Sequence, residues 1–319
     1  MLSFVFPGQG SQTPGMGRFL VDQFQIAKTT FEEASDAIHL DMKKLCFESS
    51  EADLAITKNT QPAIVCTSIA AYRVLKSETS LNEKAVAGHS VGEYAALVAA
   101  QAMSFPEAMK AVRLRGQLMQ EAVPLGQGGM IAVLGLDETQ IRFLCEWAVS
   151  ESKTGPLSPA NFNAPGQIVI SGSMKTLDWL KTHFKPEILP GEPKRAKLIP
   201  LSVSAPFHCA MMKPAEEKMA EFLKSVRIQQ AQCDVVQNVN AKPEKNSESL
   251  RKNLIEQISA PVQWTQTMET LKTSGFSHII ECGQGNILRG LFKKFDSEKF
   301  QLFGSSNIDE VKRSIELKL

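Results

Sequence analysis

Residues 87–97 read AGHSVGEYAAL, and the rest of the fold is organised around this stretch. The apolar run at 85–88 is typical of a buried strand, and residues 91–103 predict a helix that is apolar nearly all round. G-x-S-x-G lies between them, and in a strand–turn–helix context it is typical of a nucleophile elbow, with the Val91 amide near the Ser90 oxygen at a helix N-terminus. A second interpretation stays open, in which Ser90 only caps the helix and the glycines only permit close packing.

Bulk composition narrows the function class. The chain has 319 residues, 43% hydrophobic and 22% charged, with a net charge of +1. The length favours about two domains, and the balanced charge predicts no nucleic-acid partner. The N-terminus has no basic signal region and no apolar run reaches the ~18 residues of a membrane span, so we expect a cytoplasmic protein with no membrane partner. Six scattered cysteines without a C-x-x-C pair predict buried thiols and no metal site.

The elements outside the elbow alternate between strand and helix patterns. Strand patterns occur at 3–6, 234–239, 278–282 and 301–304. Helical patterns occur at 59–75, from the capping-box residue Ser104 to about 122, and at 213–225, 248–258, 286–295 and 308–318. The alternation predicts an α/β fold with a mostly parallel sheet covered on both faces.

The middle of the chain has a different rhythm. Strand, helix, strand, strand, helix and strand patterns follow one another at 129–136, 137–149, 157–163, 166–172, 175–184 and 196–203. This βαββαβ order is that of a ferredoxin-like unit. We therefore predict a small ferredoxin-like subdomain at 127–198, inserted into a large domain formed by 1–126 and 199–319.

A nucleophilic serine needs a base, and the chain has five histidines. His208 lies in SAPFHCAMMKP, a turn between a strand and a helix, where α/β proteins place catalytic groups. The others are weaker candidates: His39 and His183 lie in amphipathic helical segments, His278 begins a strand, and the side chain of His89 points away from its neighbour Ser90. No acidic partner for His208 is evident, so a backbone carbonyl is a candidate for orienting the ring.

Arg115 occupies the middle of an apolar helical stripe. Ala108, Ala111, Val112, Leu118 and Met119 form the rest of that stripe. A buried guanidinium must be paired, and two interpretations are open. Arg115 forms an internal ion pair with a carboxylate such as Glu93, or it binds a carboxylate on the substrate, for which its fork geometry is suited.

The turn PGQGSQTPGMG follows the first strand, with Gln9 at its apex. It lacks the G-K-[ST] of a phosphate-binding loop and the third glycine of a dinucleotide fingerprint. Two interpretations remain, a plain surface turn and a turn that presents a backbone amide to the active site.

Together, several motifs resemble those of the malonyl-CoA:acyl carrier protein transacylases. They are FPGQGSQ, TQPA, AGHSVGEYAAL, RG-x-x-MQEAVP, NAPGQIVISG, the Phe-His pair before Cys209, and PVQWT. The likeness is collinear and spans essentially the whole chain. It implies an α/β-hydrolase-like large domain with an inserted ferredoxin-like subdomain.

The resemblance also implies roles for particular residues. Ser90 matches the nucleophile and His208 the base. The remaining positions match the oxyanion-hole amides of Gln9 and Val91, the histidine-orienting carbonyl of Gln257, the malonyl-gripping Arg115, and the pocket residues Met119, Asn163 and Phe207. Phe207 stands where malonyl-selective members carry Phe and methylmalonyl-selective relatives carry Ser, so we expect its ring to crowd an α-methyl group.

By this resemblance the chain is a monomeric acyltransferase of fatty acid synthesis. It would move malonyl from malonyl-CoA to acyl carrier protein through a malonyl-serine ester, with no metal or redox cofactor. An acidic carrier would meet a basic rim at Lys194, Arg195 and Lys197 or at Arg289, Lys293 and Lys294, if these are not simply solvated faces. The alternatives are a serine thioesterase or hydrolase, a trans-acting acyltransferase of a polyketide pathway, and a non-catalytic carrier-docking module.

Overall fold

The structure, a computed structural model, describes residues 1–191, 196–203 and 205–317. Its larger sheet has six strands in the order β10-β9-β1-β2-β7-β8, and only the β7–β8 pair is antiparallel. The strands are β1 Leu2–Phe6, β2 Ala85–Gly88, β7 Asp234–Val236, β8 Pro243–Glu244, β9 His278–Glu281 and β10 Gln301–Gly304. The mostly parallel sheet predicted from the sequence is confirmed.

Helices cover both faces of this sheet because the side chains of its strands alternate between two cores. Phe4 and Phe6 of β1 face one core, and Val5 between them faces the other. The first core is packed by α5 Thr57–Glu78, α6 Gly92–Ala99, α7 Phe105–Glu121, α10 Lys213–Ser225, α11 Ser247–Glu256 and α14 Ile308–Ile315. The second is packed by α12 Trp264–Thr273 and α13 Ile287–Phe295. Every residue of β1 and β2 is buried, as parallel strands between two helical layers require.

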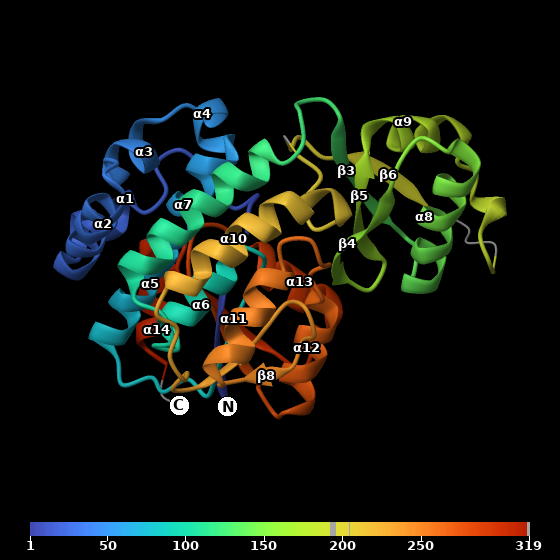
Figure 1. The fold of residues 1–319 in the computed structure, drawn as a ribbon. Coiled ribbons are helices and arrows are strands. Elements are labelled where there is room, and N and C mark those ends of the chain that lie inside the picture. Colours follow the sequence, from blue (N-terminus) through green and yellow to red (C-terminus); the bar gives the residue numbers. More distant parts are fainter. Residues whose placement is uncertain (192–195, 204, 318–319) are drawn as a thin grey trace.

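The second sheet has four antiparallel strands in the order β4-β5-β3-β6. They are β3 Gly128–Leu134, β4 Leu157–Ala164, β5 Gln167–Ser173 and β6 Lys197–Pro200, with α8 Glu138–Ser152 and α9 Met174–His183 between them in the chain. This unit has its own apolar core and lies at one end of the molecule (Figure 1). The βαββαβ order is confirmed. β6 runs to Pro200, two residues past the predicted end of the inserted subdomain.

Four short helices precede α5 and were not expected individually. They are α1 Arg18–Gln23, α2 Gln25–Ile38, α3 Met42–Glu48 and α4 Glu51–Ala55. They lie at the end of the molecule opposite the small sheet (Figure 1). Shortness explains why periodicity did not reveal three of them, α1, α3 and α4, which span fewer than eight residues each.

Several element boundaries differ from the sequence predictions. α5 begins at Thr57, two residues before the expected start. Its N-cap is Ile56, whose apolar side chain cannot accept a capping hydrogen bond. α6 stops at Ala99, because Gln101 adopts a left-handed φ of 58°. Ser104 does cap α7 by accepting the Glu107 amide, but the Glu107 carboxylate accepts from the Ser104 hydroxyl and the Arg227 amide.

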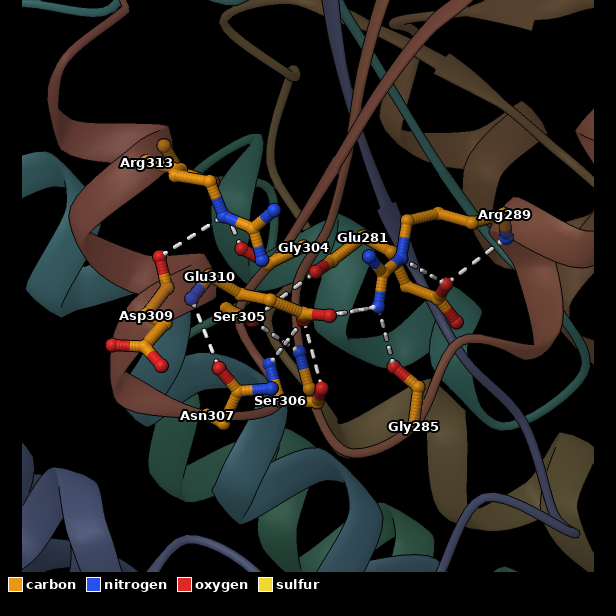
Figure 2. A network of polar contacts seen from close by, with 12 residues as sticks. Glu281, Gly285, Arg289, Gly304, Ser305, Ser306, Asn307, Asp309, Glu310 and Arg313 are labelled. Atoms are coloured by element: carbon orange, nitrogen blue, oxygen red, sulfur yellow. Dashed lines mark hydrogen bonds and ion pairs between the residues drawn. The ribbon is translucent and has the colours of Figure 1, made fainter.

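A buried polar network joins the C-terminal elements (Figure 2). The carboxylate of Glu281, at the end of β9, accepts the amides of Leu288 and Arg289 at the start of α13. The Arg289 guanidinium pairs with Glu281 at 3.4 Å and with Glu310 of α14 at 3.0 Å. Arg289 is therefore not the free rim cation considered from the sequence. Lys194 and Arg195 lie outside the described residues, and Lys197 and Lys293 are exposed.

Candidate active site

Ser90 lies between β2 and α6 with a left-handed φ of 50°, a conformation that is strained for a residue with a side chain. The flanking glycines permit the turn. A Cβ on Gly88 would lie 2.0 Å from the carbonyl carbon of Gly92, and a Cβ on Gly92 would lie 2.2 Å from the oxygen of Phe6. The strand–turn–helix elbow predicted from G-x-S-x-G is present, and it lifts the Ser90 hydroxyl to the end of the sheet.

The Ser90 hydroxyl meets the His208 ring. Ser90 Oγ lies 2.7 Å from His208 Nε2, and His208 Nδ1 lies 2.8 Å from the backbone oxygen of Gln257. A carbonyl oxygen accepts only, so Nδ1 carries the proton and Nε2 is left as an acceptor for the serine hydroxyl. Burial, reinforced by the charge of Arg115, lowers the pKa of His208 to about 3. The ring is therefore neutral and able to take a proton at physiological pH.

Arg115 of α7 is 1% exposed and points at the same hydroxyl. Its Nη1 donates to Gln61 Oε1 at 2.9 Å, and its Nη2 donates to Gln257 Oε1 at 2.7 Å and to Ser90 Oγ at 3.3 Å. All these acceptors are neutral. No ion pair between described residues involves Arg115. A buried cation without a counter-charge is suited to an anionic ligand.

Glu93, the internal ion-pair partner considered from the sequence, has other contacts. It is fully buried, and its two carboxylate oxygens accept from the Asn238 amide at 2.7 Å and from the Gln237 side chain at 3.1 Å. Burial raises the pKa of Glu93 to about 7, against the opposing effect of these hydrogen bonds. The interpretation in which Glu93 forms an ion pair with Arg115 is therefore wrong.

Two glutamines do more than sequence reasoning predicted. Gln61 was not assigned a role, although it lies in the quoted TQPA motif. The sequence predicts a role only for the backbone carbonyl of Gln257. Its side-chain Oε1 also accepts from Arg115, and its Nε2 donates to the backbone oxygen of Ser90 at 3.0 Å. It thus contacts the base, the arginine and the serine. A neutral, flexible amide gives no recognisable spacing pattern, so only the fold reveals these contacts.

A cavity of about 320 Å³ opens beside Ser90. Its polar side holds Ser90, His208 and Arg115, and the predicted pocket residues Met119 and Phe207 also line it. The other lining residues are Gln9, Gly10, Gln12, Ala55, Gln61, His89, Met130, Asn161, Leu201, Ser202 and Val203. The wall therefore combines the large sheet, α7 and the small sheet, and the volume suits a small acyl group.

Asn163, predicted to line this pocket, is not among its lining residues. Its Oδ1 lies 2.8 Å from Nε2 of His89, which does line the cavity. Asn161, two residues earlier on β4, takes the lining position. The pair joins the elbow to the small sheet. As expected, the His89 ring turns away from Ser90, toward Asn163 and the Trp264 ring.

Gln9 and Val91 are the residues whose backbone amides are predicted to form the oxyanion hole. Gln9 lines the cavity, and Val91 directly precedes α6. Among the hydrogen bonds within 1–191, 196–203 and 205–317, none is donated by either amide. The turn holding Gln9 is fixed by the Ser11 hydroxyl, which donates to the Gly8 oxygen at 2.9 Å. Both amides are thus without an acceptor among the described residues, and their part in an oxyanion hole stays a prediction.

The remaining candidates lie elsewhere. His39 and His183 are exposed, and His278 begins β9. All six cysteines are free and buried, and burial raises the pKa of each thiol. No described His, Cys, Asp and Glu side chains form a group of three that could bind a metal, and no described helix is long and apolar enough to span a bilayer.

The sequence matches known proteins over nearly its whole length. The family model described as acyl transferase domain matches residues 3–288. Malonyl CoA-acyl carrier protein transacylase of Escherichia coli K12 is 41% identical over 292 residues, 92% of each chain. The Bacillus subtilis protein of the same name is 41% identical over 293 residues, 92% of this chain and 90% of its own.

Solved structures agree with these sequence matches. A malonyl-transacylase in complex with a type II PKS acyl-carrier protein has a TM-score of 0.92 and 38% identity, covering 99% of both chains. The malonyl CoA-acyl carrier protein transacylase of Coxiella burnetii has a TM-score of 0.90 and 36% identity, covering 99% of this chain and 96% of its own. The predicted fold class is confirmed by this likeness.

Proposed function

We propose a function for this chain from its family: the chain belongs to the acyl transferase domain family, among the malonyl CoA-acyl carrier protein transacylases. It transfers the malonyl group of malonyl-CoA to the phosphopantetheine thiol of an acyl carrier protein. One observation carries the assignment. The buried cation of Arg115 has no counter-charge and shares its cavity with a serine–histidine pair. A hydrolase of neutral acyl groups would have no use for that cation.

The first half-reaction acylates the serine. His208 Nε2 takes the hydroxyl proton as Ser90 Oγ attacks the thioester carbon of malonyl-CoA. The resulting oxyanion is stabilised by the amides of Gln9 and Val91, and losing one such donor typically costs about 3–4 kcal/mol. The carbon–sulfur bond then breaks, the coenzyme A sulfur takes the proton from His208, and a malonyl ester remains on Ser90.

The second half-reaction reverses these steps with a different thiol. His208 takes the proton of the carrier's phosphopantetheine thiol, and the sulfur attacks the ester carbon. The ester bond breaks and Ser90 Oγ recovers the proton from His208. The Gln257 carbonyl keeps a proton on His208 Nδ1 throughout, because a carbonyl oxygen can only accept a hydrogen bond.

The pocket residues select the acyl group. Arg115 holds the free carboxylate of malonyl with the donors it now directs at Gln61 and Gln257. An uncharged acyl group leaves the guanidinium unpaired and is disfavoured. Phe207 and Met119 limit the space beside the acyl carbon, and Asn163 acts through His89.

The same proposal places the enzyme in its pathway. The chemistry above uses no metal or redox cofactor. The enzyme acts as a monomer in the cytoplasm, and its malonyl-carrier product supplies fatty acid synthesis. A polyketide carrier is the second candidate acceptor, because one of the similar structures holds a type II PKS acyl-carrier protein. Comparing kcat/KM for carriers of the two pathways decides between them.

The decisive test is intact mass spectrometry of the protein after incubation with malonyl-CoA, without carrier protein. We expect a stable gain of one malonyl group that is absent in Ser90→Ala. Free malonate and coenzyme A accumulating without an adduct would instead identify a thioesterase. No adduct and no turnover, with carrier binding retained, would identify a docking module.

A further inference from the structure

We propose that Asn238 is a positioning residue for this reaction: its side-chain amide holds the Ser90 backbone in the strained conformation that presents Oγ to His208. The inference rests on the acyl transfer proposed above. Asn238 does not line the cavity and does not touch the Ser90 hydroxyl. It acts on the nucleophile only through the backbone.

The Asn238 side chain takes the place of a strand. β7 pairs with β2 in parallel up to Val236, opposite Ala87, and there its backbone leaves the ladder. Asn238 Nδ2 then donates to the Gly88 oxygen at 2.6 Å, and Asn238 Oδ1 accepts the Ser90 amide at 2.7 Å. A neighbouring parallel strand would bond to these same two groups on either side of one residue. The ladder is thus extended through the elbow by one amide.

Glu93 closes the arrangement into a ring. The backbone amide of Asn238 donates to Glu93 Oε2 at 2.7 Å, and the backbone amide of Glu93 donates to the backbone oxygen of Ser90 at 3.0 Å. Ser90, Asn238 and Glu93 are therefore each bonded to the other two. Both Asn238 and Glu93 are fully buried, so water does not substitute for a missing partner without reorganisation.

The strain at Ser90 gives the ring its purpose. A non-glycine residue at φ 50° relaxes unless its surroundings hold it, and rotation there moves Oγ away from His208 Nε2. Gln257 Nε2 secures the Ser90 oxygen, but only Asn238 among the described side chains accepts the Ser90 amide. Arg115 is held by Gln61 and Gln257 and has no bond to Asn238, so we expect the malonyl carboxylate to bind nearly as well without Asn238.

Asn238→Leu tests the inference, since it keeps the number and branching of the side-chain heavy atoms and removes both bonds. We expect the single-turnover rate of Ser90 acylation by malonyl-CoA to fall about 100-fold, the typical effect of displacing a reacting group by about 1 Å. The dissociation constant for malonyl-CoA, measured in a Ser90→Ala background with and without Asn238→Leu, is expected to change less than about threefold, within the context-dependence of one contact.

Asn253→Leu is the matched control. It also removes a buried amide, which donates to Gln237 Oε1 at 2.9 Å and does not touch the elbow. We expect a lower melting temperature with an acylation rate near that of wild type. An Asn238→Leu rate within about threefold of wild type, or a parallel loss of acylation and binding, overturns the inference.

Two further measurements keep the test decisive. If Asn238→Leu does not fold, Glu93→Gln replaces it. The donors to Glu93 are the Asn238 backbone amide and the Gln237 side chain, and this change leaves one of them facing an amide NH₂. Its acylation rate is expected to fall about tenfold with unchanged binding, and a wild-type rate overturns the inference. If wild type forms no malonyl-serine, the proposed function fails on its own. The rate of Ser90 phosphonylation by a fluorophosphonate, compared between wild type and Asn238→Leu, then tests separately whether Asn238 positions Ser90.

Discussion

Ser90 Oγ lies within hydrogen-bonding distance of the neutral ring of His208 and the cation of Arg115, so one hydroxyl connects proton transfer with charge recognition. The two neighbours are related electrostatically. The charge of Arg115 is one of the causes that depress the pKa of His208, after burial. A bound malonyl carboxylate would offset that charge and make His208 more basic when substrate is present.

Arg115→Ala should separate malonyl from acetyl transfer. Removing the buried cation takes away the carboxylate's partner, so we expect kcat/KM for malonyl-CoA to fall at least about 100-fold while acetyl-CoA is used better than by wild type. Arg113→Ala is the control, because Arg113 bonds to the Lys58 oxygen and Asn59 outside the cavity. Equal loss of malonyl and acetyl transfer would refute the proposed clamp.

Phe207→Ser should widen the acyl pocket. Phe207 is 7% exposed and lines the cavity, so its loss makes space beside the α-carbon of the acyl group. We expect the ratio of kcat/KM for methylmalonyl-CoA to that for malonyl-CoA to rise about tenfold. Phe143→Ser, at an exposed position on α8, should leave the ratio unchanged. An unaltered ratio in Phe207→Ser would exclude this ring as the selective feature.

His208 should make the fold sensitive to acid. Its pKa is about 3 in the folded protein and 6.5 ordinarily, so below pH 6.5 the unfolded chain binds a proton that the folded protein does not. This contribution to stability is present above pH 6.5 and is lost as the pH falls toward 3. Between pH 7 and 5 the free energy of unfolding should drop by about 2 kcal/mol more in wild type than in His208→Gln. Urea unfolding at both pH values measures these free energies, and an equal drop in wild type and His208→Gln would contradict the prediction.

At the scale of elements, the active site is built from segment ends that converge. The turn after β1 supplies Gln9, the turn after β2 supplies Ser90, and the end of α11 supplies Gln257. The network in Figure 2 supports the next strand along, because it fixes the start of α13 to β9. The loop between them packs on the turn of Gln9: a Cβ on Gly283 would lie 3.0 Å from the Pro7 ring.

Arg289→Met should therefore destabilise the protein. The change leaves the carboxylate of Glu281, fully buried at the end of β9, without its counter-charge. Breaking a buried pair in this way typically costs about 3–5 kcal/mol, to be read from urea unfolding. Lys224→Met, which removes a solvent-exposed ion pair with Glu221, should cause no measurable change. Equal stabilities of the two variants would show that the network is dispensable.

The sequence predicted the elements that carry periodic apolar residues and failed for contacts between residues that are far apart in the chain. β2, α7 and the βαββαβ unit follow from apolar patterns and capping, and the placement of Ser90 at an elbow follows from G-x-S-x-G between a strand and a helix. The contacts of Gln61 and Asn238 join residues more than 50 positions apart in the chain, and no local pattern encodes them. Arg115 lay between these cases, since its burial was predictable but its partner was not.

At the scale of the whole molecule, two sheets with separate cores meet at one cavity. Ser90 after β2, Arg115 on α7 and His208 before α10 contribute polar groups to this cavity, and the small sheet contributes Met130 and Asn161 to its wall. The hydrogen bonds that connect the units near the site include the His89–Asn163 bond and the Phe162 amide, which donates to the Val262 oxygen at 2.9 Å. The division at 127–198 into a separate subdomain stays a prediction.

Hydrogen exchange under increasing urea tests that division. If 127–198 is a cooperative unit, the amides of β3 and β5 should exchange through an opening with a lower free energy than those of β1 and β2. Asn163→Leu should lower that opening energy further, because it removes one connection to the elbow. A single opening energy shared by both sheets would mean that the chain unfolds as one body.

The split wall of the cavity also bears on how such an enzyme diversifies. Ser90 and His208 lie outside residues 127–198, whereas part of the cavity wall comes from Met130 and Asn161 in the small sheet, which has an apolar cluster of its own. Selection acting on the insert can therefore change the range of accepted acyl groups while the nucleophile, its base and their supports are inherited intact. Chimeras that exchange only this segment between relatives would measure its share of acyl selection apart from Arg115, Met119 and Phe207, which they leave unchanged.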